Sequence, residues 1–394
     1  MKFTFLLLVW TALSLALQSR GLPIPDPDSP SQLAPRGHLE KSYLIGGFGY
    51  QPLNGNGNYK IVTSAYLYVA QPKSIGLGFL TSVARLLHLD VDHLGEHMSQ
   101  CFRRLKLLFT IGIPMVRLKV SITGCQTTQV TLSRTGWKHL GLVSATEDIG
   151  KCTEVMLTVK AENSDEPGTI YLTPPEGFMI ISDIDDTIKI TDVLEEKLMF
   201  ENTAYKDPVP VKGMPELYAS LSKQLVMNST PPFFVYISGS PFELHKFLND
   251  FLKDDFPASR GPLLLQNLTI SDPKGAAKTL TGGDDGESKV DYKMRQITDV
   301  HGYLGQKKVL AVGDSGEMDP ETYGDAYRKF GEKFIKCIWI HVLDDKKAKN
   351  TQERFDKAFE GVPKERILLF HTSDIPRLQT IEVAKGKCNF GGGV

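Results

Sequence analysis

Two aspartates, Asp183 and Asp185, stand one residue apart just after an apolar run at 177–182. The run has the length and composition of a buried strand. Carboxylates are costly beside a buried strand unless a cation or a reaction uses them. A carboxylate nucleophile with a second carboxyl group nearby suits phosphoryl transfer through an aspartyl-phosphate. The pair therefore predicts Asp183 as the nucleophile and Asp185 as the general acid and base.

Such a reaction also needs hydrogen-bond donors and positive charge on the phosphoryl oxygens, and carboxylates that hold a divalent cation. Ser238 follows a second apolar run and is expected to donate a hydrogen bond to the phosphoryl group. Lys293 is expected to neutralise that group. Asp314, which follows a third apolar run, and Asp319 are expected to hold Mg²⁺ directly or through water.

The elements that must position these residues follow from the pattern past Pro175, where apolar runs alternate with helical stretches. This alternation predicts an α/β domain with a parallel sheet. The runs at 178–181, 233–237 and 309–312 are the expected strands before the three polar positions. Because ligands bind at the carboxyl ends of such strands, we expect the three polar positions to meet at one edge of the sheet.

Helices are expected between the strands. A capping box begins at Ser240 and predicts a helix start there. A second helix is expected over 288–304, with Lys293 beside its apolar face, so that the ammonium can reach inward. Asp319 precedes a proline and also suits a helix N-cap, a role that can coexist with holding a metal.

These residues, in this order, resemble the four motifs of the haloacid dehalogenase superfamily. Longer phrases at 181–189, 236–242, 261–265 and 312–323 look like the catalytic domain of the actin-patch-associated phosphatidate phosphatase family. The resemblance covers roughly residues 174–380. It implies a Rossmannoid parallel sheet with helices on both faces and Mg²⁺-dependent phosphatase activity. It also implies phosphatidate as the leading substrate, converted to diacylglycerol and phosphate.

The resemblance also implies individual roles. Asp183 attacks phosphorus, and the backbone carbonyl of Asp185 helps to bind Mg²⁺. Thr187 belongs to the signature of the superfamily. The expected metal-binding residues are Asp183, Asp185, Asp314 and Asp319. The expected phosphate-binding residues are Thr187, Ser238, Gly239 and Lys293.

The rest of the chain divides by composition. Residues 1–18 are predicted to be a secretory signal peptide, with a membrane anchor as the alternative. Residues 19–42 are rich in Pro and Ser and predict a linker. Short alternating runs predict a smaller β-sandwich-like domain over 43–173, interrupted by a helical insert at 80–108. Residues 381–394 are expected to form a flexible tail.

Several features favour export. Asn228 and Asn267 open two sequons that we expect to be glycosylated. The five cysteines lack metal-ligand spacing. Cys125 with Cys152 is a candidate disulfide in an oxidising compartment, an odd thiol is left over, and the sequence leaves the pairing open. No segment after the leader is apolar enough to cross a bilayer. The expected location is therefore extracellular.

Global charge points to no nucleic-acid partner. The chain has 45 basic and 46 acidic residues, a net charge of −1. This balance gives no overall attraction to nucleic acid or to an anionic membrane. The phosphate chemistry predicted above must therefore come from a local site.

Substrate access is the least determined feature. Neither 189–213 nor 252–288 is long enough for a large folded cap. An open site favours a bulky substrate, such as a phospholipid reached by transient contact with a membrane surface, or a phosphoprotein. Four apolar residues beyond the first motif are expected either to touch acyl chains or to pack the segment 189–213 itself. They are Leu194, Leu198, Met199 and Phe200. The alternatives are a secreted phosphatase acting on phosphoproteins or small phosphomonoesters, and a catalytically silent binding protein.

A zinc site is a further alternative. Residues 93–97 fit the pattern H-x-x-E-H, which binds zinc in some metalloproteases. Gly95 weakens the helix that this pattern needs, and the sequence offers no clear third ligand. We therefore interpret the segment as a solvated helix face.

Overall fold

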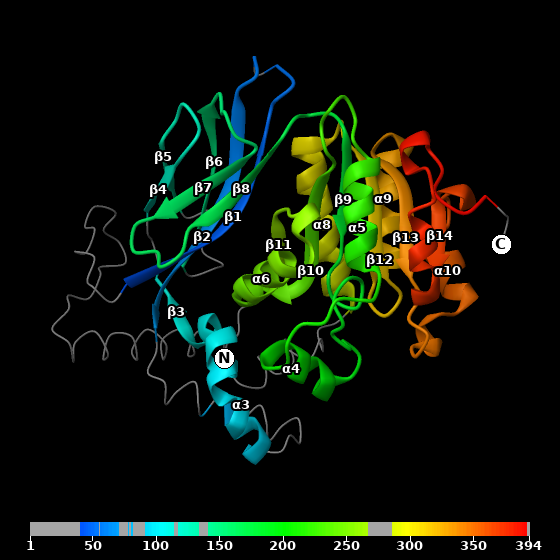
Figure 1. Ribbon diagram of the computed structural model, residues 1–394, viewed down its shortest axis with the longest axis horizontal. Coiled ribbons are helices and arrows are strands. Elements are labelled where there is room, and N and C mark those ends of the chain that lie inside the picture. The colour runs from blue at the N-terminus through cyan, green and yellow to red at the C-terminus, as the bar shows by residue number, and fades with distance from the viewer. Residues whose placement is uncertain are drawn as a thin grey trace. The chain divides into compact units, whose positions relative to one another are not determined.

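A computed structural model describes residues 40–54, 56–70, 78, 80–81, 91–113, 117–133, 141–266 and 286–391. Residues 41–394 form one compact unit. The predicted signal peptide, most of the linker and Asn267 lie outside the described residues. The prediction of an α/β domain preceded by a β-rich region is confirmed (Figure 1).

A six-stranded sheet forms the framework of the C-terminal domain, in the order β11-β10-β9-β12-β13-β14. All its pairings are parallel. The strands are β9 Phe178–Ser182, β10 Phe233–Pro241, β11 Leu263–Gln266, β12 Lys308–Asp314, β13 Ile335–His341 and β14 Ile367–Phe370. The chain runs outward from β9 in both directions, through β10 on one side and β12 on the other. The carboxyl end of β9 is therefore a topological switch point, the usual place for a ligand.

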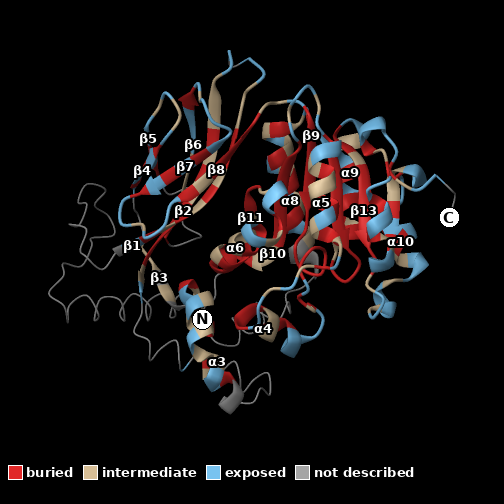
Figure 2. Cartoon of the chain, viewed as in Figure 1, coloured by how far each residue is buried: buried red, intermediate tan, exposed pale blue. Residues whose placement is uncertain are grey.

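Helices cover both faces of this sheet. Successive residues of β9 point to opposite faces: Ile180 packs with one apolar core and Ile181 with the other. Helices α5 and α6 contribute to the first core, and α8 and α9 to the second. Figure 2 shows the resulting contrast between buried strands and the exposed outer surface of α10. Among the described residues of the domain, the helices are α4 Glu196–Ala204, α5 Met214–Gln224, α6 His245–Asp255, α8 Gly286–Leu304, α9 Asp319–Phe334, α10 Gln352–Ala358 and α11 Ile375–Leu378.

The β-rich region forms one hydrogen-bonded sheet, in the order β3-β2-β1-β8-β7-β4-β5, with β6 paired to β2. Ser133 and Ser144 exchange two backbone hydrogen bonds of 3.0 and 3.1 Å, which join the end of β5 to β6 and close the sheet on itself. Its core is aliphatic. The strands are β1 Glu40–Tyr50, β2 Tyr59–Ala70, β3 Thr110–Gly112, β4 Leu118–Ile122, β5 Gln129–Leu132, β6 Leu142–Gly150, β7 Met156–Ala161 and β8 Gly168–Thr173.

Short helices complete the architecture. The described part of the predicted helical insert contains α3 Val91–Arg104 and the 3₁₀ helix η1 Lys106–Phe109. The remaining 3₁₀ turns are η2 Phe242–Leu244, η3 Pro257–Ser259, η4 Lys347–Lys349, η5 Lys364–Arg366, η6 Thr372–Asp374 and η7 Val383–Lys385. Within the described ranges, no helix is both long enough and apolar enough to span a bilayer.

Two disulfides tie the fold together. Cys125–Cys152, the candidate pair from the sequence, joins the loops after β4 and β6, and Cys101 is a free, buried thiol. The second bond, Cys337–Cys388, corrects the expectation of a flexible tail, at least up to residue 391. Cys388 is buried, and the indole of Trp339 donates a hydrogen bond of 2.8 Å to its carbonyl. The tail is therefore anchored on β13.

Candidate active site

The loop after β9 carries the first predicted residues. The N–H of Asp183 donates to the carbonyl of Val312 at 2.9 Å, so the parallel pairing of β9 with β12 holds Asp183 at the sheet edge. Asp186 has a left-handed φ of 57°, and its carboxylate accepts three backbone N–H groups from 191–193 at 2.7 to 2.8 Å. These bonds fold the chain back toward the sheet. Thr187 then lies inside the loop, with its hydroxyl donating to Asp183 at 3.2 Å.

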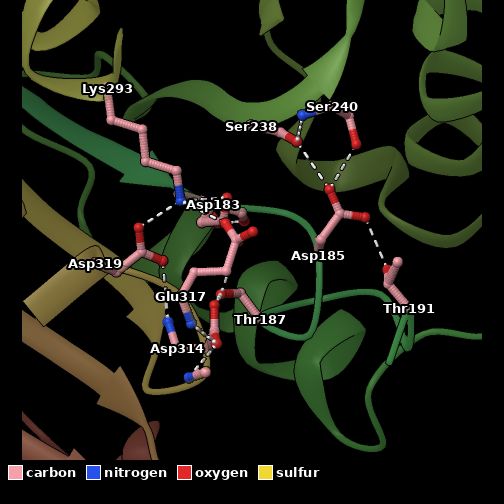
Figure 3. A network of polar contacts seen from close by, with 12 residues as sticks. Asp183, Asp185, Thr187, Thr191, Ser238, Ser240, Lys293, Asp314, Glu317 and Asp319 are labelled. Carbon is pink, nitrogen blue, oxygen red and sulfur yellow. Dashed lines mark hydrogen bonds and ion pairs between the residues drawn. The ribbon is translucent and has the colours of Figure 1, made fainter. Parts of the chain in front are cut away.

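Lys293 lies at the centre of the first polar group. Its ammonium contacts Asp183 at 2.9 Å, Asp319 at 2.5 Å and Glu317 at 3.3 Å (Figure 3). Asp314 completes the group: its N–H donates to Asp319 at 3.1 Å, and its Oδ1 accepts the N–H groups of Gly316 and Glu317. We call Asp183, Lys293, Asp314, Glu317 and Asp319 the Lys293 cluster.

The Lys293 cluster holds four buried carboxyl groups and one ammonium. Burial first, and then repulsion from Asp319 and Asp183, raises the pKa of Asp314 well above its ordinary value. Burial also raises the pKa of Asp183, although Lys293 opposes the shift. Such an excess of buried acid is unfavourable unless a cation compensates it.

The same carboxyl groups suit a divalent cation. One oxygen from each of Asp183, Asp314 and Asp319 lies within 4.8 Å of the others, and the described residues contain no second group of this kind. Carboxylate oxygens are the ligands that Mg²⁺ and Ca²⁺ prefer. The donor set and its surplus of negative charge therefore fit a divalent metal.

A second polar group surrounds Asp185 and differs in character. Its Oδ2 accepts hydrogen bonds from the hydroxyls of Ser238 and Ser240, both at 2.8 Å. Its Oδ1 accepts from Thr191 at 2.7 Å and lies 3.4 Å from the ammonium of Lys189. Burial alone would raise the pKa of Asp185, but Lys189 and the three hydroxyls outweigh it and lower the pKa. These five residues form the Asp185 cluster, which favours the charged form of the carboxylate.

The structure brings the predicted residues to one edge of the sheet and divides them between the two clusters. Lys293 reaches inward from α8, as predicted. The hydroxyl of Ser238 donates to Asp185 and accepts the N–H of Ser240 at 2.9 Å, and its contact with a phosphoryl group stays a prediction. Gly239 lies between these two serines on β10 and is half-buried. Asn228 is exposed in the turn before β10.

The capping predictions at Ser240 and Asp319 were wrong. Strand β10 continues to Pro241, and no side-chain cap begins the following turn. Ser240 therefore joins the Asp185 cluster, a role that its hydroxyl spacing two residues after Ser238 could have suggested. Asp319 is the first residue of α9, and its carboxylate binds Lys293 and the N–H of Asp314 instead of capping the helix.

Sequence reasoning also missed several supporting residues. Glu317 was overlooked although it lies between the two predicted metal ligands of its loop. His341 ends β13 at the same sheet edge, and its Nδ1 lies 3.0 Å from the carbonyl of Asp186. Arg354 donates to the carbonyls of Ser315 and Glu317, both at 2.5 Å. It thereby holds, from outside, the loop 314–319, which we call the metal-side loop. The position of His341 at the end of an apolar run could have identified it, but nothing in the sequence pairs Arg354 with that loop.

In the segment 93–97, which fits the zinc pattern, the described part makes a different contact. The ring of His97 stacks on Tyr205 with centroids 4.6 Å apart. The side chain of His93 lies outside the described residues.

The sheet topology and the two acidic segments at its edge, 183–187 and 314–319, define a phosphatase domain consistent with the haloacid dehalogenase superfamily. Residues 178–342 match the model of the phosphatidate phosphatase APP1 catalytic domain. This segment is therefore similar to the catalytic domain of a phosphatidate phosphatase-like hydrolase.

Similar proteins include phosphatidate phosphatase APP1 of Saccharomyces cerevisiae, 29% identical over 177 residues. An uncharacterized protein of Schizosaccharomyces pombe is 25% identical over 195 residues. The matches cover 43% and 48% of this chain but only 27% and 28% of those relatives. A solved ferredoxin-NADP⁺ reductase from Plasmodium falciparum aligns with 84% of this chain and 95% of its own, at 8% identity and a TM-score of 0.18, which supports no inference.

Proposed function

We propose that the chain hydrolyses phosphatidate to diacylglycerol and phosphate, using Mg²⁺ and an aspartyl-phosphate intermediate. The observation that carries this proposal is the Lys293 cluster, in which a buried carboxylate nucleophile stands beside three further carboxyl groups and one ammonium. The match of residues 178–342 to the catalytic domain of a phosphatidate phosphatase supports the lipid substrate.

The proposed reaction has two steps. An oxygen of Asp183 bonds to phosphorus while the bond from phosphorus to the diacylglycerol oxygen breaks, and that oxygen takes a proton from the acid form of Asp185. Asp185 then accepts a proton from water as the water oxygen attacks phosphorus. The bond to Asp183 breaks, phosphate leaves, and both carboxyl groups regain their starting forms.

Side chains around the nucleophile support these steps. Lys293 offsets charge on Asp183 and on the phosphoryl oxygens. The hydroxyls of Ser238 and Ser240 stabilise the basic form of Asp185, which suits the water-activating step. Asp183, Asp314 and Asp319, with the backbone carbonyl of Asp185, would hold Mg²⁺. When bound, that ion supplies positive charge that reduces repulsion between Asp183 and the substrate.

Export remains part of the proposal. Two disulfides, Cys125–Cys152 and Cys337–Cys388, support an oxidising compartment. Expression in a secreting cell should place the chain in the medium with glycan on exposed Asn228. Retention of the whole chain inside the cell, without glycan, would contradict this part.

The function is tested by phosphate release from phosphatidate, a phosphopeptide panel and sugar phosphates, with the full chain and Mg²⁺. We expect release from phosphatidate, its loss on chelation with EDTA, and a drop of at least about a thousandfold in Asp183→Asn. Circular dichroism of the variant controls for folding. EDTA-resistant hydrolysis, an active Asp183→Asn variant, or release from phosphopeptides alone would overturn the assignment.

A further inference from the structure

Exposed apolar side chains concentrate beside the site. We call residues 189–213, between the first motif and α5, the flap. Of the ten large apolar side chains that are at least 36% exposed among the described residues, four lie in the flap, so the clustering is local. These are Ile190, Leu194, Leu198 and Val209.

The flap is attached directly to the active site. Lys189 and Thr191 at its base bind Asp185. The N–H of Ile190 donates to the carbonyl of Val209 at 2.8 Å, which brings these two exposed residues onto adjacent backbone segments. A Cβ built on Gly316 in the metal-side loop would lie 3.9 Å from Leu194. The apolar surface therefore adjoins the catalytic carboxylates.

Packing of the flap itself uses other residues. Phe200 is fully buried and Met199 nearly so, whereas Leu198 beside them is 39% exposed and Leu194 is 41% exposed. The flap thus has its own apolar contacts inside and a second apolar set outside. The outer set contributes less to packing the flap than the inner set does, and exposed apolar side chains gathered beside a site are typical of an interaction surface.

We propose that Ile190, Leu194, Leu198 and Val209 dock on the surface of a lipid bilayer and bring phosphatidate to Asp183. This inference rests on the proposed function. Phosphatidate carries its phosphate directly on the glycerol, only a few bonds from the acyl chains. A buried nucleophile can reach that phosphorus only if the protein surface around the site approaches the bilayer closely.

The charge of the flap specifies how it binds. Residues 189–213 contain five acidic and four basic side chains, a net charge of −1. Attraction to anionic headgroups therefore cannot drive docking, and the apolar side chains must do so. Vesicle binding should accordingly change little between low and physiological salt.

The test uses the Leu198→Ser/Val209→Ser double variant, which leaves Leu194 beside the metal-side loop intact. Phosphatidylcholine vesicles containing phosphatidate serve for co-sedimentation and for hydrolysis, and p-nitrophenyl phosphate serves as a soluble substrate. We expect vesicle binding and vesicle hydrolysis to fall about tenfold. The rate on the soluble substrate should stay within about twofold. Leu53→Ser, at a leucine that is 68% exposed in the β1–β2 turn, is the matched control and should change nothing.

The outcomes separate this inference from the proposed function. Unchanged vesicle binding in the double variant would overturn the inference, as would failure of the unaltered chain to sediment with vesicles, which would point to a protein partner for the flap. An equal loss on both substrates would show a structural role and overturn it too. Co-sedimentation of Asp183→Asn needs no catalysis, so docking is measured even if no phosphomonoester is hydrolysed.

Discussion

The Lys293 cluster and the Asp185 cluster lie at one edge of one sheet, yet they balance charge in opposite ways. In the first, one ammonium faces four buried carboxyl groups. In the second, one carboxylate receives three hydroxyls and an ammonium. The pKa of Asp314 is raised by burial and by neighbouring carboxylates, whereas that of Asp185 is lowered by its partners against the effect of burial.

This difference teaches what each group can accept. The Asp185 cluster is complete by itself, so an added cation would gain little there. The Lys293 cluster carries surplus negative charge, so a divalent cation would relieve repulsion and stabilise the fold at once. One site thus combines the Asp185 carboxylate, held by hydrogen bonds, with a pocket whose surplus negative charge can hold the metal.

Removing the single ammonium should have the largest effect. In Lys293→Met, the buried carboxyl groups lose their only cationic partner within the cluster. We expect the free energy of unfolding at pH 7 to fall by about 3–5 kcal/mol and hydrolysis to be lost. Urea unfolding measures the first effect, and added Mg²⁺ should restore part of the stability. A variant as stable as the original chain would break the comparison.

Removing one carboxylate should weaken metal binding and stabilise the metal-free protein. Asp314→Asn should lower Mg²⁺ affinity and activity at least about a hundredfold, measured by calorimetry and phosphate release. Because the pKa of Asp314 is raised by burial and by Asp319, its ionisation opposes folding, and metal-free stability is lost as pH rises above the ordinary carboxyl range. The Asn variant should lose less stability over that rise. Unchanged pH dependence would contradict this account.

The smallest effect is expected in the Asp185 cluster. Ser240→Ala removes one hydroxyl from Asp185, whose pKa is held low by Lys189 and the hydroxyls against burial. The pKa should rise, so the basic limb of kcat/KM, where Asp185 loses the proton that the leaving oxygen needs, should move to higher pH by less than about one unit. Ser222→Ala, which removes a hydroxyl bonded to a backbone carbonyl in α5, is the control. A limb that shifts equally in both variants would sink the assignment.

Sequence predicted the parts of the site that depend on strand ends. Asp183 and Asp314 follow buried runs, and parallel strands bring their carboxyl ends together whatever the loops do. Lys293 was predictable because helical periodicity fixes which face it joins. The partners of Asp185 were not, since Lys189 and Thr191 reach it only through a loop whose turn depends on Asp186. Likewise, the Cys337–Cys388 bond requires a tail that returns to β13.

The order of residues within the Lys293 cluster has a consequence for synthesis. Lys293 belongs to α8, which is translated before β12 and the loop that carries Asp314, Glu317 and Asp319. A chain emerging from the ribosome therefore holds the compensating ammonium, together with Asp183, before three of the four acids are made. The sheet can add β12 without first assembling an uncompensated group of carboxylates.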